Sequence, residues 1–192
     1  MCIRDRKRKI VKYIKGEAFP WWWEKETVYT MRNNAGFFSA TPDQLKRFSE
    51  MMIEDMSLID ILASWRYEEQ CFSNELQNAY KIDFEPYTPF WSDIPWTTAL
   101  ENRKVLVVHP FAETIQKQYL RKELIHKDLR ILPTFNLQTI KAVQTIGNHT
   151  DSRFKTWFDA LEFMKNEIDK RDYDICLLGC GAYGLPLAAH IK

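Results

Sequence analysis

Residues 173–184, YDICLLGCGAYG, decide the fold class of this chain. The first six residues form a short apolar run, which is typical of a parallel strand buried on both faces. A glycine-rich turn follows, and residues 185–191 then have the pattern of a helix. A buried strand that passes through glycines into a helix is the repeating unit of α/β proteins.

The residues before this stretch alternate in the same way. Residues 104–109, KVLVVH, are a second continuous apolar run, and Pro110 ends it. The expected elements of this half of the chain are strand 104–109, helix 112–126, short strands 129–132 and 139–143, and a helix that Asp151 caps and that ends near residue 170. We therefore expect a Rossmann-like α/β fold with an open, mainly parallel sheet, right-handed crossovers and flanking helices.

A capped helix is the clearest element of the first half. Thr41 is a suitable N-cap and Pro42 suits the first helical position. Apolar residues then recur at spacings of three and four from Leu45 to Leu62 and Ala63, which predicts one long amphipathic helix.

Residues 66–100 are aromatic and punctuated by prolines, and we expect an ordered connecting segment with one short helix. The prediction is a mainly helical, aromatic-rich part over residues 1–100 and a Rossmann-like part over residues 101–192. Together they form one continuous domain.

The chain contains 192 residues with 27 basic and 26 acidic side chains, for a net charge of +1. Residues 1–15 carry +6, so the remaining 177 residues carry −5. The near-neutral overall charge argues against a dedicated nucleic-acid-binding protein, and the basic character belongs to one short end of the chain. The basic end is either a patch for an anionic surface or a solvated terminus. No run of 18 apolar residues occurs, which excludes a transmembrane helix.

Three adjacent tryptophans, Trp21 to Trp23, cannot all lie on one face of a helix. They either cap the core of this domain or contact another surface, such as a partner or a membrane interface.

Four cysteines are too few for a disulfide-stapled scaffold, and no second Cys or His pair at zinc spacing accompanies Cys176 and Cys180. Reduced thiols in a cytoplasmic protein fit this usage.

The candidate ligand site follows the strand at 173–178. In open α/β sheets, ligands bind beyond the carboxyl ends of the strands. The spacing Gly-x-Gly-x-x-Gly at this position predicts a turn that cradles phosphate. A tight strand–helix turn without a ligand remains the alternative. The residues predicted to bind the ligand here are Gly179, Gly181, Ala182, Tyr183 and Gly184.

The end of the strand at 104–109 supplies a second group of candidates. His109 could bond a phosphate or a sugar hydroxyl, with Thr114 in the next helix beside it, although a lone histidine is often structural. His109 and Glu69 are the candidates for a catalytic role. Asp83 and Glu85 have the spacing of a divalent-cation motif, but this spacing is common by chance, and no metal ligand is assigned.

Three segments together resemble a known family: residues 34–38 with the capped helix, residues 105–119, and residues 178–188, LGCGAYGLPLA. They are similar to bacterial proteins with a GT-D-type glycosyltransferase fold, which are found with capsule and exopolysaccharide genes. The resemblance implies a Rossmann-like domain, a nucleotide-sugar donor and a divalent cation (Mn or Mg). The family's acidic motif is expected before residue 7, and its chains continue past the final helix. We therefore expect this chain to be a fragment, truncated at both ends.

The function expected from the resemblance is transfer of a sugar from a nucleotide-sugar donor to a polysaccharide or lipid-linked glycan acceptor. The expected location is the cytoplasm, at the inner face of the membrane, with peripheral membrane contact and without nucleic acid. The alternative is a non-catalytic nucleotide-binding or assembly module whose tryptophan-rich segment docks a partner. The sequence leaves the oligomeric state open.

Overall fold

The structure is a computed structural model that describes Ile14 and residues 25–147, 149 and 151–192. The predictions made for the tryptophan run, for the basic residues 1–13 and for Lys15 lie outside the described residues.

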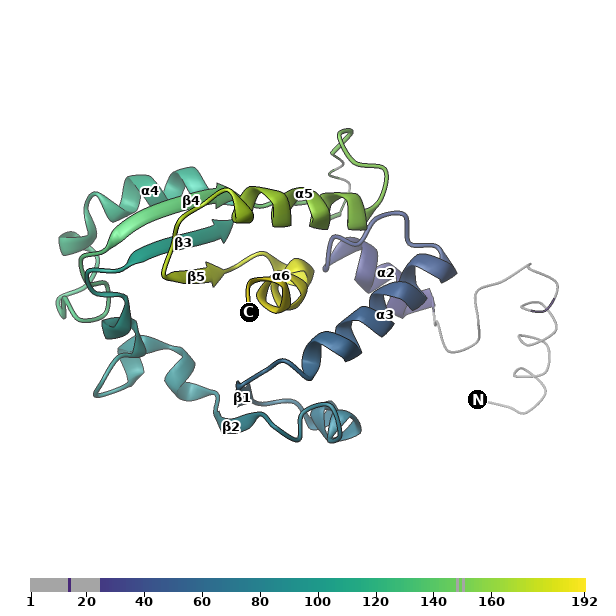
Figure 1. Ribbon diagram of the computed structural model, residues 1–192, viewed down its shortest axis with the longest axis horizontal. Coiled ribbons are helices and arrows are strands. Elements are labelled where there is room, and N and C mark those ends of the chain that lie inside the picture. The colour runs from purple at the N-terminus through teal and green to yellow at the C-terminus, as the bar shows by residue number, and fades with distance from the viewer. Residues whose placement is uncertain (1–13, 15–24, 148, 150) are drawn as a thin grey trace.

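The main sheet consists of three parallel strands, and β3 is the central one (Figure 1). Their bounds are Lys104–His109 for β3, Asn136–Lys141 for β4 and Ile175–Leu178 for β5. The strand order is β4-β3-β5, with Val107 opposite Thr139 on one side and opposite Leu177 on the other. The chain therefore continues from β3 to a neighbour on one side and then to a neighbour on the opposite side.

Helices cover both faces of this sheet. Leu106 and Val108 of β3 point into a buried cluster that includes residues of α5 (Trp157–Asp169) and α6 (Gly184–Ile191). Val105 and Val107 pack on the other face with Tyr119, the last residue of α4 (Ala112–Tyr119). The prediction of an α/β protein with an open parallel sheet and flanking helices is confirmed.

The first two described helices pack onto the same core. These are α2 (Lys25–Asn33) and α3 (Pro42–Met56). Phe37, in the loop between them, is fully buried, with its ring centroid 5.4 Å from that of Trp157 on α5. Thr41 caps α3 as predicted and accepts a hydrogen bond from the Gln44 N–H at 3.4 Å. One hydrophobic cluster thus joins the two halves of the chain.

The long first helix was predicted wrongly beyond Met56. Instead, the chain turns and forms β1 (Ile61–Ser64), which pairs in parallel with β2 (Tyr80–Asp83). The N–H groups of residues 57–59 each bond to the carbonyl oxygen three residues earlier, and these tighter turns end the helix. The two strands form a separate small sheet at the bottom of Figure 1.

The segment 66–100 also differs from the prediction of one short helix. It contains β2 and four short 3-10 turns, at residues 67–72, 85–87, 89–91 and 96–100. Prolines at positions 86, 89 and 95 restrict this stretch and prevent a longer helix.

The strand predicted at 129–132 is absent, and residues 128–132 form turns instead. The Asp128 carboxylate accepts a hydrogen bond from the Arg130 N–H at 3.0 Å, a local bond that competes with strand pairing. The strand predicted at 139–143 is β4, which begins and ends earlier, at Asn136 and Lys141.

Two helices are shorter than predicted. Helix α4 ends at Tyr119, whose hydroxyl oxygen accepts a hydrogen bond from the Phe135 N–H at 2.7 Å. Helix α5 begins at Trp157 with Thr156 as its N-cap, because Asp151 bonds to Arg153 instead of capping the helix. Within the described part of the chain, no helix is long and apolar enough to cross a bilayer.

Candidate functional site

The carboxyl ends of β3 and β5 meet at a cavity of about 190 Å³. The chain adds β4 on one side of the central strand β3 and then β5 on the other side, and such a reversal of strand order is a switch point, where open α/β sheets bind ligands. The cavity is lined by residues 34–36, 109–111, 143–146, 179–181 and Tyr183. The structure thus brings together His109, Gly179, Gly181 and Tyr183, which the sequence predicted as site residues from two separate motifs.

His109 is held in a defined orientation at the end of β3. Its Nδ1 accepts a hydrogen bond from the Phe111 N–H at 3.0 Å. A neutral imidazole in this arrangement carries its proton on Nε2, which is therefore a hydrogen-bond donor. The ring is half-buried, with its centroid 5.3 Å from that of Phe111.

The His109 imidazole packs directly against Gly179. A Cβ atom added to Gly179 would lie 2.5 Å from His109 Cδ2 and 3.3 Å from Nε2. Ordinary van der Waals contacts begin near 3.4 Å, so a side chain at position 179 would displace the imidazole. The first glycine of the motif is thus needed for its close contact with histidine.

The next two residues form a small concave surface of backbone N–H groups. Cys180 has φ −126° and Gly181 has φ +62°. When successive residues have backbone conformations of opposite handedness, their N–H groups point toward one position. Among the described residues, neither the Cys180 N–H nor the Gly181 N–H has an acceptor. By contrast, the Gly179 N–H donates to the Val108 carbonyl oxygen at 3.0 Å. We call residues 180–181 the anion nest, because such an arrangement binds negatively charged oxygen atoms.

Tyr183 contributes a second unpartnered group. Its side chain is 2% exposed and stacks on the Trp157 indole, with ring centroids 4.5 Å apart. No described group makes a hydrogen bond to Tyr183 Oη. Burial raises the pKa of this phenol, and the neighbouring Thr145 opposes that shift. The phenol is therefore a neutral, buried donor beside the cavity.

Two loops that the sequence did not predict as parts of the site complete its wall. Thr145 is buried and donates a hydrogen bond from Oγ1 to the Gly36 carbonyl oxygen at 2.6 Å. Gly36 has φ +69°, and an added Cβ atom would lie 3.3 Å from the same hydroxyl oxygen. The turn signal around Gly36 was visible in the sequence, but its contact with a residue 109 positions later was not.

Cys180 does not supply a nucleophile to this cavity. Burial raises the pKa of the Cys180 thiol to about 11 and that of Cys176 to about 12. Both side chains are therefore neutral thiols near pH 7, whereas nucleophilic attack and metal binding require the thiolate.

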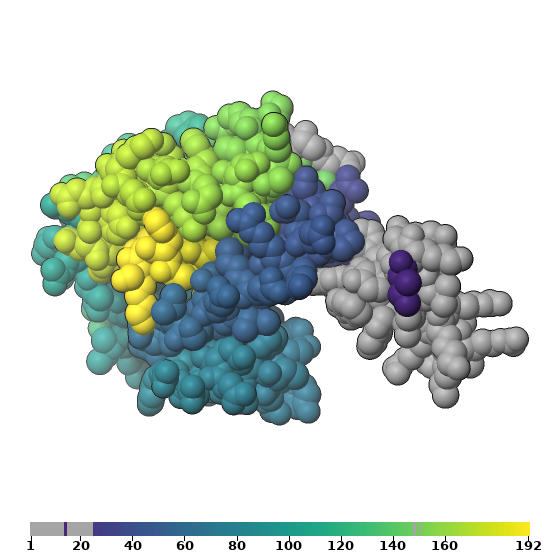
Figure 2. Space-filling view, turned by 45° about the vertical axis from the view of Figure 1, so that its right-hand side comes forward, coloured from purple at the N-terminus to yellow at the C-terminus, as the bar shows by residue number. Residues whose placement is uncertain are grey.

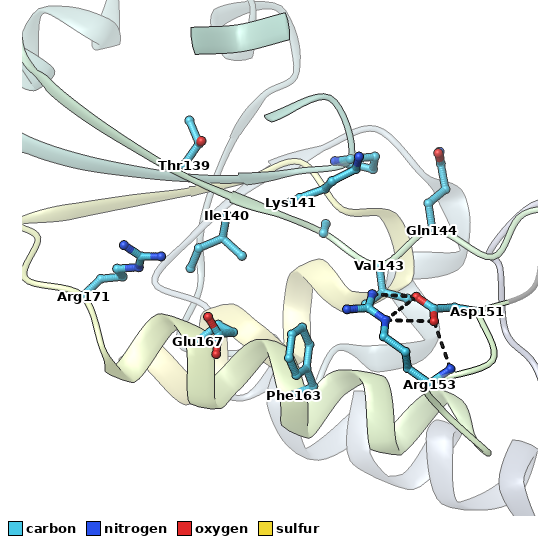
Figure 3. A pocket seen from close by; sticks show the side chains of 12 residues that line it. Thr139, Ile140, Lys141, Val143, Gln144, Asp151, Arg153, Phe163, Glu167 and Arg171 are labelled. Carbon is cyan, nitrogen blue, oxygen red and sulfur yellow. Dashed lines mark hydrogen bonds and ion pairs between the residues drawn. The ribbon is translucent and has the colours of Figure 1, made fainter. Parts of the chain in front are cut away.

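A larger cavity of about 480 Å³ adjoins the first and shares Pro110, Val143 and Gln144 with it. Figure 3 shows Phe163 and Glu167 rising from α5 toward β4, with Arg171 at one end and Arg153 at the other.

Charged side chains dominate the wall of this larger cavity. Arg153 binds the Asp151 carboxylate through two nitrogens, at 2.6 Å and 3.0 Å. This contact lowers the pKa of Asp151, so the pair stays ionised. Lys141 and Arg171 add two further cations to the lining, and Glu167 adds a carboxylate. Acidic and basic side chains therefore line the larger cavity, whereas the lining of the smaller cavity contains no Asp, Glu, Lys or Arg.

Three predicted ligand-binding residues do not line either cavity. Ala182 packs against the main hydrophobic cluster, and Gly184 begins α6, where its N–H donates to the Gly181 carbonyl oxygen. Thr114 is an exposed residue of α4.

Glu69, the second catalytic candidate, lies in the segment between β1 and β2. Its carboxylate accepts hydrogen bonds from the Ser64 hydroxyl and from the N–H groups of Trp65 at 3.0 Å and Arg66 at 2.8 Å. These bonds, the one from Ser64 first, lower the pKa of Glu69. The arrangement gives this carboxylate a capping role at the 3-10 turn of residues 67–72.

The residues of the candidate site do not fit a divalent cation. The lining of the smaller cavity includes no carboxylate, although hard cations prefer oxygen ligands. No group of three His, Cys, Asp or Glu side chains that could hold a metal occurs in the described ranges, and this includes the neighbourhood of Asp83 and Glu85.

Comparisons with models of protein families, with curated proteins and with solved structures found no match to this chain.

Proposed function

We propose that this chain is a glycosyltransferase domain that transfers a sugar from a nucleotide-sugar donor to a polysaccharide or lipid-linked acceptor. The observation that carries the proposal is the convergence of free N–H groups, a histidine donor and an unpartnered phenol on one cavity at the β3–β5 switch point. The resemblance of residues 105–119 and 178–188 to a glycosyltransferase family supports the same function, as does the open parallel sheet with helices on both faces.

The anion nest suits the diphosphate of such a donor. Backbone N–H groups fixed in advance stabilise the negative charge that develops on a leaving nucleoside diphosphate, because they need no reorganisation during the reaction. Gly181 leaves open space in front of the nest, since an added Cβ atom would meet nothing within 4 Å. We assign the diphosphate to this position.

His109 and Tyr183 are the two side chains that we assign to the bound donor. His109 Nε2 lies beside Gly179, where it can donate a hydrogen bond to a phosphate or sugar oxygen. Tyr183 Oη would gain the partner that it lacks within the described structure. A buried hydroxyl without a partner costs about 1–3 kcal/mol, so a ligand oxygen at this point would bind favourably.

The sizes of the two cavities support an extended ligand. Sites for small molecules and cofactors usually have about 300–1,000 Å³, and the smaller cavity has about 190 Å³. Only the diphosphate or the sugar would fit it. The remainder of the donor would occupy the adjoining cavity beside Lys141 and Arg171.

A thermal-shift titration tests this proposal. UDP-sugars and GDP-sugars are added with and without Mn²⁺, and UDP or GDP release is followed in parallel with a glycan acceptor. A bound donor at 100 times its Kd stabilises the folded state by about 2.7 kcal/mol. The free nucleosides serve as controls because they lack the diphosphate. The absence of a shift with every nucleotide sugar would refute the proposal for this chain.

A non-catalytic nucleotide-binding or assembly module is the second candidate function. The absence of a carboxylate in the lining of the smaller cavity favours it, because glycosyl transfer commonly uses a general base. Stabilisation by a nucleotide sugar without any release of UDP or GDP would identify this second function.

The proposed setting is the cytoplasm at the inner face of the membrane, where nucleotide sugars and lipid-linked acceptors meet.

A further inference from the structure

The segment from Trp65 to Trp96, which we call the aromatic layer, exposes an unusual number of rings. Among the described residues, eight of the ten exposed aromatic side chains lie in this segment. Tyr67 is 79% exposed, Tyr80 71%, Trp91 69% and Trp65 65%. Groups of exposed apolar side chains in stable proteins mark interaction sites.

The aromatic layer has almost no core of its own. Only Leu76 and Pro95 are buried within it. Figure 2 shows this blue-teal part of the chain below α3 and the yellow α6. Lys192 reaches the residues just before the layer, with its ammonium group 2.6 Å from the Asp60 carboxylate. The rings are therefore available for a partner rather than needed for folding.

The rings are nevertheless fixed relative to one another. Phe84 packs between Trp65 and Tyr87, at centroid distances of 5.6 Å and 5.5 Å. The Trp96 indole N–H donates a hydrogen bond to the Tyr87 carbonyl oxygen at 3.0 Å. The Arg66 guanidinium lies over the Trp65 ring, 5.1 Å from its centroid. A ligand would therefore meet a platform that loses little conformational entropy on binding.

The charge of the layer excludes polyanions. Residues 65–96 contain six carboxylates and two basic side chains, for a net charge of −4. Nucleic acids and anionic membranes require Lys and Arg, so this surface would repel them.

The combination of rings and carboxylates fits a sugar chain. The face of a pyranose ring presents C–H groups with partial positive charge, which the negative face of an aromatic ring attracts. Carboxylate oxygens accept hydrogen bonds from sugar hydroxyls, and Glu68, Asp83 and Glu85 are all exposed beside the rings. The core of a protein interface is instead depleted of charged residues, because burying them is costly. A neutral glycan matches both features.

We propose that the aromatic layer binds a neutral glycan chain. Its assignment as the acceptor rests on the proposed function, but the binding itself needs neither the donor nor the β3–β5 cavity. Trp65, Tyr87 and Trp91 are the stacking residues.

Native affinity electrophoresis tests this proposal without any nucleotide sugar present. The gels contain dextran, galactomannan or mannan as neutral polysaccharides, and alginate as the anionic comparison. At least one neutral polysaccharide retards the wild-type chain, and alginate does not. Trp65→Ala and Tyr87→Ala each weaken this retardation about tenfold, whereas Trp65→Phe preserves it because a ring remains.

Leu120 and Leu124 supply the matched control, because they are 85% and 84% exposed and lie outside the layer. Leu120→Ala and Leu124→Ala leave retardation unchanged, and thermal denaturation confirms that every variant folds. Three outcomes overturn the proposal: no retardation by any neutral polysaccharide, equal weakening in the leucine variants, or a dimer in light scattering that Trp65→Ala dissociates. Loss of donor binding with retained retardation would refute only the proposed function.

Discussion

Replacing Gly179 by alanine tests the contact that shapes the candidate site. The new Cβ atom would lie 2.5 Å from His109 Cδ2, so the imidazole must move by about 1 Å to reach an ordinary contact distance. Overpacking of this kind costs about 1–3 kcal/mol. For a chain of this size, a loss of about 2 kcal/mol lowers Tm by about 4–8 °C. The displaced Nε2 donor would also weaken nucleotide-sugar binding about tenfold.

Gly184→Ala is the matched control for this variant. Gly184 has helical backbone angles, φ −57° and ψ −55°, and an added Cβ atom meets nothing within 4 Å. We expect stability that is unchanged or higher by about 0.5–1 kcal/mol. Urea denaturation of both variants gives the free energies of unfolding, and calorimetric titration gives the affinities.

A double variant separates the histidine contact from any other effect at position 179. In a His109→Ala background the Cβ atom meets no imidazole, so Gly179→Ala costs less than about 0.5 kcal/mol. Equal stability of Gly179→Ala and Gly184→Ala would refute the reasoning. A Gly179→Ala change that lowers the free energy of unfolding as much in the His109→Ala background as in the wild-type chain would refute it as well.

Three further predictions concern the phenol, the shared core and a helix cap. Tyr183→Phe removes a buried hydroxyl without a partner, so urea denaturation finds stability unchanged or raised by up to about 1 kcal/mol, while calorimetry finds weaker donor binding; a clear loss of stability contradicts this. Phe37→Ala lowers stability by about 3–5 kcal/mol in one cooperative transition, because residues from both halves pack around this ring; two separate transitions in calorimetry contradict it. The Asp159 carboxylate accepts a hydrogen bond from the Thr156 N–H, which lowers its pKa below 3.8, so its stabilising effect is complete above that pH and is lost as pH falls through the lowered value. Asp159→Asn therefore flattens the fall in Tm as the pH drops below 3.8, and an unchanged pH profile contradicts the assignment.

The strands and glycines at the centre of the site were predictable because their signals are local. Val105–Val108 of the central strand β3 are apolar on both faces, as a buried parallel strand must be, and Ile175–Leu178 of the neighbouring strand β5 form an equally apolar run. The Gly179–Gly184 spacing then indicated where the chain turns into α6. The prediction that His109 and this turn belong to one site needed only the rule that the carboxyl ends of parallel strands lie at the same edge of a sheet.

The edges of the fold were less predictable. β4 has the sequence NLQTIK, in which polar residues interrupt the apolar run that marks β3 and β5, so its signal is weaker. Residues 129–132, LRIL, are predominantly apolar and had the stronger strand pattern, but a turn at Asp128 and the buried Pro133 interrupt it. β1 and β2 have four residues each, which is too short for a clear sequence pattern. They are strands because they pair with each other.

The Gly36–Thr145 contact shows why part of the site was missed. The two residues lie 109 positions apart and have no shared motif. Their proximity follows from the packing of Phe37 against Trp157, which is a property of the assembled core.

Calorimetric titration of nucleotide sugars into the wild-type chain and two valine variants tests the central claim most directly. Gly181 and Gly147 both have positive φ, +62° and +66°, and both have open space around an added Cβ atom. The strain of valine is therefore similar at the two positions, but only Gly181 lies in the cavity lining. The account predicts that Gly181→Val abolishes donor binding and that Gly147→Val retains it. Retained binding in Gly181→Val, or no binding by the wild-type chain, would contradict the account.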